Sequence, residues 1–185
     1  MRVLVTGASG FIASHLCPRL EAAGHEVWRH LRYVSGGQGR YDFYEHERVV
    51  MADLRDRHGL AIAFAKAKPE VIFHLAAISA VSYSFQHPEE VYDVVANGAA
   101  RVADIARELG AIVVHASTSE VYGRESEYTW PVTESALIGG TSPYGAAKVA
   151  AEEYLRMCQS IYRQPVVIAR PHNTHGRAPI SNRHY

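Results

Sequence analysis

The sequence predicts a doubly wound α/β fold, in which helices cover both faces of a parallel sheet. Short apolar runs rich in Val and Ile recur along the chain, and stretches with helical periodicity separate most of them. Continuously apolar strands that alternate with helices are typical of a parallel sheet buried on both faces. The expected strands occupy residues 2–6, 25–31, 48–52, 70–77, 111–117 and 165–170. The expected helices occupy residues 10–23, 56–66, 88–108 and 143–163.

Length and composition fit one cytoplasmic α/β domain. With 185 residues, of which 48% are hydrophobic and 21% charged, the chain can bury one sizeable core. Its 19 basic and 19 acidic side chains balance, which argues against nucleic acid or a membrane surface as a partner. Cys17 and Cys158 stand far apart in helical patterns and indicate a reducing compartment. The N-terminus does not read as a signal peptide, and no apolar window approaches the ~20 residues that span a bilayer.

The turn after the first strand, "TGASGFIA" (6–13), indicates a dinucleotide site of the Rossmann type. Gly7, Gly10 and Ala13 recur at intervals of three. Glycines there allow a tight turn and close approach of a pyrophosphate to a helix N-terminus, where free N–H groups favour negative charge. The alternative is that the glycines serve only the steric needs of the turn. The cofactor-binding residues expected from this turn are Gly7, Ser9, Gly10, Phe11 and Ile12.

The end of the second strand, "WRHLRY" (28–33), favours NADP, with NAD as the alternative. Leu31 stands where an NAD-preferring protein usually carries an acidic residue for the ribose hydroxyls, and Arg32 follows it. Arginine can grip a 2′-phosphate through its planar fork. Arg29 or Arg40 are candidate helpers, although all three arginines could simply solvate a loop. Asp53 could accept a hydrogen bond from the adenine amino group or cap a turn.

Two further segments carry candidate chemistry. "ASTSEVYG" (116–123) follows the fifth expected strand, and "SPYGAAK" (142–148) opens the last expected helix with Tyr144 and Lys148 four residues apart. Tyr and Lys at this spacing are ordinary helix neighbours, and Thr118, Ser119 and Glu120 have the composition of a capped loop. Neither segment alone distinguishes a catalytic site from a structural turn.

Taken together, six ordered segments resemble the extended short-chain dehydrogenase/reductases that act on nucleotide sugars. They are "TGASGFIASHL", "ADL" (52–54), "HLAA" (74–77), "ASTSEVYG", "SPYGAAK" and "ARPHNTHG" (169–176). Within that family the chain looks most like GDP-mannose 4,6-dehydratase, which implies an NADP-dependent sugar-nucleotide 4,6-dehydratase. The alternatives are a nucleotide-sugar 4-epimerase, a UDP-glucuronate decarboxylase-like enzyme, and an inactive cofactor-binding module.

The resemblance assigns catalytic roles to four residues. Tyr144 is the base that takes the proton of the sugar C4 hydroxyl, and the charge of Lys148 favours its phenolate. Lys148 also holds the nicotinamide ribose. Thr118 hydrogen-bonds the reacting oxygen, and Glu120 removes the C5 proton so that water can leave from C6.

The same resemblance implies the remaining contacts. Ser84, Ser119 and Asn173 are expected to bind the substrate. Val95 and Ala99 depart from the family pattern, as does His172, and His172 and His175 lack the companions of a metal pair. The further cofactor-binding residues are Arg32, Asp53, Leu54, Leu75, Ala76 and Ala77, together with Tyr144 and Lys148.

Two units are expected along the chain. Residues 1–170 form the NAD(P)-binding domain with the catalytic Tyr and Lys, and residues 171–185 begin a truncated substrate-binding region, because relatives continue for nearly as much chain again. The C-terminal substrate domain is therefore expected to be largely missing, and the 185-residue unit to bind cofactor better than it turns over substrate. A homo-oligomer through the helices at 88–108 and 143–163 is implied by the same relatives.

Overall fold

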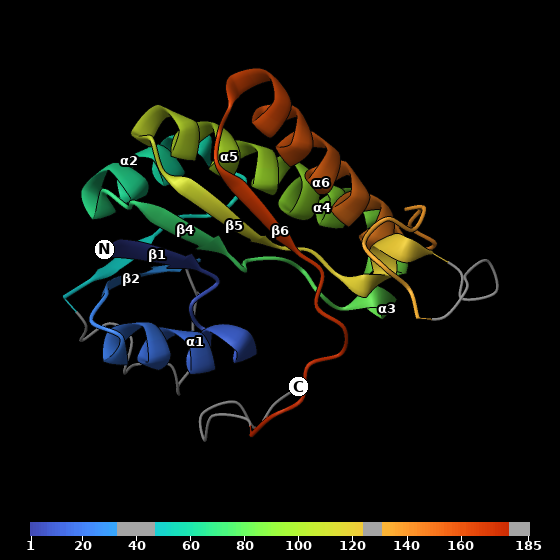
Figure 1. Cartoon of the computed structure of the whole chain (residues 1–185), viewed down its shortest axis with the longest axis horizontal. Helices are drawn as coiled ribbons and strands as arrows, with labels where there is room; N and C mark the ends of the chain where they lie inside the picture. Colours follow the sequence, from blue (N-terminus) through green and yellow to red (C-terminus); the bar gives the residue numbers. More distant parts are fainter. Residues whose placement is uncertain (33–46, 124–130, 178–185) are drawn as a thin grey trace.

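In a computed structural model, which describes residues 1–32, 47–123 and 131–177, six parallel strands form one sheet. Their order is β3-β2-β1-β4-β5-β6 (Figure 1). The chain therefore builds outward from β1 in one direction and restarts at β4 in the other. The strands are β1 (Arg2–Thr6), β2 (Glu26–Leu31), β3 (Val49–Met51), β4 (Val71–His74), β5 (Ile112–Ala116) and β6 (Val166–Ala169). The predicted doubly wound parallel sheet is confirmed.

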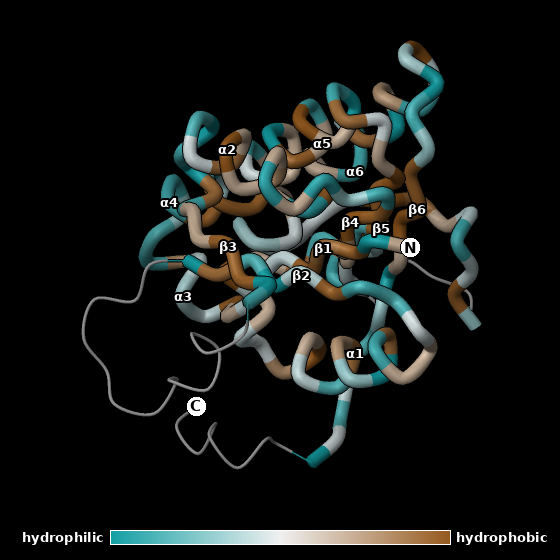
Figure 2. Tube along the Cα trace, turned by 90° about the vertical axis from the view of Figure 1, so that its left-hand side faces the viewer, coloured by the Kyte–Doolittle hydropathy of each residue, from teal (hydrophilic) through white to brown (hydrophobic). Residues whose placement is uncertain are grey.

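The helices are divided unequally between the two faces of the sheet. One face is covered by α2 (Arg57–Ala67), α5 (Gly98–Leu109) and α6 (Pro143–Tyr162), and α1 (Phe11–Ala22) lies on the other (Figures 1 and 2). The predicted helix at 88–108 is a continuous run of α4 (Pro88–Tyr92), a π-helical turn (Asp93–Asn97) and α5. Among the described residues, none of the helices combines the length and apolar character needed to cross a membrane.

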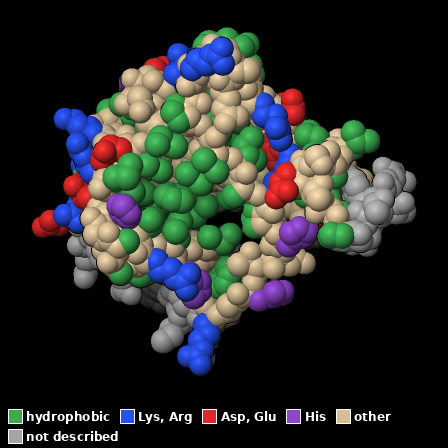
Figure 3. All heavy atoms as spheres, in the orientation of Figure 1, with side chains coloured by type: hydrophobic (Ala, Val, Ile, Leu, Met, Phe, Trp, Pro, Cys, Tyr) green, Lys and Arg blue, Asp and Glu red, His purple; other side chains and the backbone are tan. Residues whose placement is uncertain are grey.

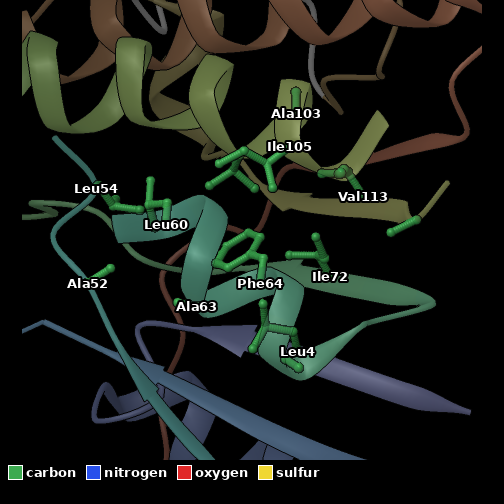
Figure 4. Packing of buried hydrophobic residues seen from close by; sticks show 14 of the residues in the cluster. Leu4, Ala52, Leu54, Leu60, Ala63, Phe64, Ile72, Ala103, Ile105 and Val113 are labelled. Atoms are coloured by element: carbon green, nitrogen blue, oxygen red, sulfur yellow. The ribbon is translucent and has the colours of Figure 1, made fainter. Parts of the chain in front are cut away.

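The main core lies between the sheet and the three helices of the first face. Leu4, Ile72 and Val113 point from neighbouring strands toward Phe64 of α2 and Ile105 of α5 (Figure 4). A smaller cluster packs α1 against the opposite face through Ala13 and Cys17. Cys17 and Cys158 are both buried, neither forms a disulfide, and each belongs to one of these two core clusters.

The α1 face is less covered over the outer strands. Hydrophobic side chains gather there in the view of Figure 3, and Val167 of β6 is 53% exposed. Phe73 of β4 and Val114 of β5 are only half-buried. The described residues thus bury one face of β4–β6 well and leave the other partly open.

Candidate active site

A cavity of about 910 Å³ opens where the strand order reverses, between the carboxyl ends of β1 and β4. Such a reversal point is where open α/β sheets bind ligands. Residues from six regions of the chain, far apart in sequence, line it together. The lining comprises Gly7, Ser9, Gly10, Phe11, Ile12, Arg32, Leu75, Ala76, Ala77, Ser79, Val81, Ala116, Ser117, Thr118, Ser119, Glu120, Tyr144, Lys148, Pro171, His172, Asn173 and Thr174.

The glycine turn forms the wall beside α1. Gly7 has φ +67°, and a Cβ added there would lie 2.8 Å from the Ala76 Cα, so both its conformation and its space require glycine. A Cβ at Gly10 would lie 3.1 Å from the Gly7 carbonyl oxygen. Gly10 caps α1 without a side chain, and the first helical residues, Phe11 and Ile12, are uncharged and line the cavity. Free N–H groups at this helix start fit a phosphate group.

The start of α6 places Tyr144 and Lys148 on the facing wall. Ser142 caps the helix by accepting a hydrogen bond from the Gly145 N–H at 2.9 Å, and Pro143 occupies its first turn. Tyr144 is 7% exposed and Lys148 4%. The Lys148 Nζ donates to the Ala116 carbonyl oxygen at 2.6 Å and lies 5.9 Å from the centroid of the Tyr144 ring.

Burial dominates the proton affinities of this pair. It lowers the pKa of Lys148 to about 8, with the Glu152 carboxylate acting in the opposite direction. Burial also raises the pKa of Tyr144, against a hydrogen bond with Thr118 that lowers it and alongside the Glu120 charge, which raises it. The phenol is therefore protonated at neutral pH in the free chain, and the effect of Lys148 on Tyr144 stays a prediction.

Thr118 and Glu120 come from the segment after β5. The Thr118 hydroxyl accepts from the Glu120 N–H at 3.2 Å and caps a 3₁₀ turn, Ser119–Tyr122. The Ser119 N–H donates to the Pro171 carbonyl oxygen at 3.1 Å, which ties this segment to the chain after β6. Thr118 is thus both a structural cap and a cavity residue.

Fifteen of the predicted site residues meet in this cavity, whereas Asp53, Leu54 and Ser84 do not. Asp53 accepts hydrogen bonds from the Arg55 guanidinium at 2.9 and 2.8 Å, and this pairing lowers the Asp53 pKa to about 2. Leu54 is buried in the main core. The fifteen are Gly7, Ser9, Gly10, Phe11, Ile12, Arg32, Leu75, Ala76, Ala77, Thr118, Ser119, Glu120, Tyr144, Lys148 and Asn173.

Ser84 and Arg29 do not lie where the sequence analysis expected them, at the substrate and at a 2′-phosphate. Ser84 is fully buried in a short helix, α3 (Val81–Gln86), and its hydroxyl donates to the Val81 carbonyl oxygen, so it does not reach the cavity. Arg29 points toward α1, where it pairs with Glu21 at 2.7 Å. It is therefore not a helper for a 2′-phosphate. Arg40 lies outside the described residues.

Sequence reasoning missed several residues at the site. Val81 lines the cavity from the start of α3, Ala116 and Ser117 line it from the end of β5, and Pro171, His172 and Thr174 line it from the chain after β6. Ser79 also lines it, although Ser84 was preferred from the same segment. The position of "RPHNTH" directly after the last strand was the available signal, since strand ends meet at one edge of a parallel sheet. The described residues contain no group of three or more side chains suited to a metal ion.

A comparison with protein families identifies the chain. A family model described as GDP-mannose 4,6 dehydratase matches residues 4–182. The chain belongs to this family. The matched range runs from within β1 to beyond β6 and includes Tyr144 and Lys148 of α6.

The curated relatives that this chain matches include both 4-epimerases and 4,6-dehydratases. A UDP-glucose 4-epimerase of Mycolicibacterium smegmatis is 40% identical over an alignment of 183 residues, which covers 95% of this chain and 57% of the relative. A probable dTDP-glucose 4,6-dehydratase of Sinorhizobium fredii is 30% identical over 190 residues, with 95% and 54% covered. The chain therefore spans about half the length of these relatives.

Solved structures agree with the architecture. The UDP-glucose 4-epimerase of Thermus thermophilus, in complex with NAD, has a TM-score of 0.81 and 33% identity, covering 92% of this chain and 54% of that one. The dTDP-glucose 4,6-dehydratase DesIV of Streptomyces venezuelae, with NAD and TYD bound, has a TM-score of 0.77 and 30% identity, covering 92% and 55%. Both kinds of enzyme share this Rossmann-type sheet.

Proposed function

We propose that this chain is the cofactor-binding and catalytic part of an NADP-dependent sugar-nucleotide 4,6-dehydratase, with a GDP-sugar as substrate. The observation that carries the proposal is the joint placement of Glu120, Thr118 and Tyr144 in one cavity, with the Glu120 charge close enough to raise the pKa of the Tyr144 phenol. A 4-epimerase needs a base only at C4. A dehydratase needs a second acid or base for C5 and C6, and Glu120 is suited to that role.

The residues on the cavity walls fit a nicotinamide dinucleotide. Gly7 and Gly10 leave backbone exposed for a pyrophosphate, and Lys148 stands where it can reach the sugar next to the nicotinamide. When bound, the oxidised nicotinamide supplies reversible acceptance of a hydride from C4 of the sugar. Arg32 supports NADP, because it is the cavity's cation at the end of β2 and Leu31 before it brings no carboxylate. NAD is the alternative, since the solved relatives carry it.

The side chains then divide the proton transfers. Tyr144 as phenolate takes the C4 hydroxyl proton, while Thr118 holds that oxygen through its hydroxyl. Glu120 removes the C5 proton, which the adjacent C4 ketone has made acidic. Glu120, now protonated, or a water beside it, then gives a proton to the C6 hydroxyl as that group leaves as water. The hydride is then returned to C6, and a proton returns to C5 that balances the one Tyr144 took from the C4 hydroxyl. The sugar is left with a ketone at C4, and the cofactor is not consumed.

A 4-epimerase is the second candidate, because the relative with 40% identity is named UDP-glucose 4-epimerase. Incubation with NADP or NAD and a panel of GDP-mannose, UDP-glucose, dTDP-glucose and UDP-glucuronate separates the candidates by product mass. Loss of water supports the dehydratase, and an isomer detected by chromatography supports the epimerase. Loss of carbon dioxide supports a decarboxylase, and no product supports an inactive cofactor-binding module.

The role of Glu120 has its own test. Glu120→Gln is expected to abolish loss of water while sparing C4 oxidation, which absorbance of the reduced nicotinamide reports. Glu153→Gln, on the exposed side of α6, is the matched control and should change neither step. Full dehydratase activity in Glu120→Gln would remove this carboxylate from the mechanism.

A further inference from the structure

The chain after β6 runs from one side of the cavity to the other. Its first residues, Pro171 to Thr174, line the cavity. The chain then passes the start of α1 (Figure 1), where Nε2 of the His15 ring lies 2.9 Å from the Arg177 carbonyl oxygen. We call residues 171–177 the strap, because they connect the end of β6 with the helix that follows the glycine turn.

The β6 end of the strap is held by a buried ion pair. Arg170, directly before the strap, donates to both carboxylate oxygens of Glu152, with the shortest contact 2.6 Å. The two side chains are 7% and 0% exposed. The Ser119 N–H adds a hydrogen bond to the Pro171 carbonyl oxygen at 3.1 Å. Because a buried, bidentate ion pair is costly to break, this end is a fixed anchor.

The α1 end of the strap is held by lighter contacts. A carbonyl oxygen only accepts, so the exposed His15 donates through Nε2 to Arg177. The Phe11 ring stands edge-on to the His15 ring, with centroids 5.2 Å apart. Gly176 lies against the same ring, because a Cβ added there would be 3.1 Å from Phe11 Cζ. One exposed hydrogen bond is much weaker than the ion pair at the other end, so the strap opens from α1.

This lighter end lies beside the place expected for a pyrophosphate. Phe11 is the first residue of α1 and lines the cavity, so its contacts with Gly176 and His15 bring the strap to the free N–H groups of the helix start. His172 and Asn173, in the middle of the strap, line the same cavity. The strap therefore borders the space between the glycine turn and Lys148 at several points along its length.

We propose that His15 is a positioning residue that latches the strap to α1, and that a dinucleotide enters and leaves the cavity when this latch opens. A latch that closes on both the free and the loaded chain slows both directions. Loosening it should therefore raise the association and dissociation rates by a similar factor and leave Kd nearly unchanged. A residue that only shaped the binding surface would instead change Kd. The proposal rests on the dinucleotide binding of the proposed function and not on its sugar chemistry.

The latch itself is tested by trypsin without any cofactor, because the Arg177 carbonyl that His15 holds belongs to the bond that trypsin cuts. The rate of this cut follows the open population of the strap. His15→Leu removes the donor and is expected to speed cleavage after Arg177 about threefold. His15→Gln keeps a side-chain N–H donor and should remain close to wild type.

Two controls make the digestion specific. His58→Leu replaces an exposed histidine of α2, on the other face of the sheet, and should leave cleavage after Arg177 unchanged. Cleavage after the exposed Arg163, at the end of α6, is followed by mass spectrometry in the same digest and should be equal in all four proteins. Equal cleavage after Arg177 in wild type and His15→Leu would overturn the latch.

The gate is tested by stopped-flow fluorescence with NADPH and NADH. Association and dissociation that are both about threefold faster in His15→Leu, with Kd within twofold of wild type, would support it. Unchanged rates, or a faster dissociation alone, would overturn it even if the strap opens in the digest. If neither nucleotide bound to wild type, the dinucleotide site of the proposed function and the gate would both fail, while the digest would still decide the latch.

Discussion

At the scale of single residues, the site depends on Gly7, where no residue with a Cβ fits. Gly7 and Gly110 have nearly the same left-handed backbone, with φ +67° and +69°. They differ in surroundings: a Cβ at Gly7 would collide with the backbone of Ala76, whereas one at Gly110 would meet no described atom within 4 Å. The glycine pattern of the sequence predicted the turn but not which glycine faces β4.

The two glycines form a matched pair of variants. Gly110→Ala is expected to lower the free energy of unfolding by about 1 kcal/mol, the cost of the left-handed conformation alone. Gly7→Ala adds a collision that backbone must absorb, so it should cost more and also weaken NADP binding. Urea unfolding and nucleotide titration measure the two effects. Equal losses of stability and unchanged binding would contradict the close contact between Gly7 and Ala76.

Buried histidines make stability sensitive to acid. Burial lowers the pKa of His30 to about 4. As pH falls below about 6.5, the unfolded chain binds a proton at His30 that the native chain does not bind. This residue alone should therefore lower the free energy of unfolding by about 1 kcal/mol per pH unit down to pH ~4, in addition to the like effects of the buried His74 and His115. His30→Leu should make this part of the pH profile in urea unfolding less steep by about 1 kcal/mol per pH unit, and the exposed His58→Leu should leave the slope unchanged. Parallel profiles for wild type and His30→Leu would show that His30 is not buried in its neutral form.

At the scale of elements, the hydrophobic pattern predicted all six strands and four helices to within a few residues, because short apolar runs recur along the chain and long amphipathic stretches separate most of them. It did not predict α3, since six residues cover fewer than two helical turns. Arg29 was misplaced because neighbouring strand residues point to opposite faces. Glu152 escaped notice because its main partner, Arg170, is 18 residues away, at the end of a strand.

The N-cap of α6 links an element boundary to the site. Ser142→Ala removes the acceptor for the Gly145 N–H and should lower the free energy of unfolding by about 1 kcal/mol. Because Tyr144 stands in that first turn, the same variant should weaken nucleotide binding. Asp56→Ala removes the equivalent cap of α2 and should cost similar stability while leaving binding intact. If both variants bound nucleotide equally well, the Ser142 cap would not contribute to positioning Tyr144 in the site.

At the scale of the whole molecule, the family and sheet topology follow from six ordered motifs, whereas the choice of sugar does not. The described residues form the cavity between the glycine turn and the start of α6, and the chain spans about half the length of its curated relatives. On the proposed function, Glu120 is the residue expected to distinguish a dehydratase from an epimerase.

The central claim is that the cavity at the strand reversal holds a nicotinamide dinucleotide between the Gly7–Ile12 turn and Lys148. A crystal structure of the chain grown with NADP tests it most directly. We predict the pyrophosphate at the start of α1, the 2′-phosphate beside Arg32, and the nicotinamide beside Tyr144. A dinucleotide bound elsewhere, or an empty cavity at saturating NADP and NAD, would contradict the claim.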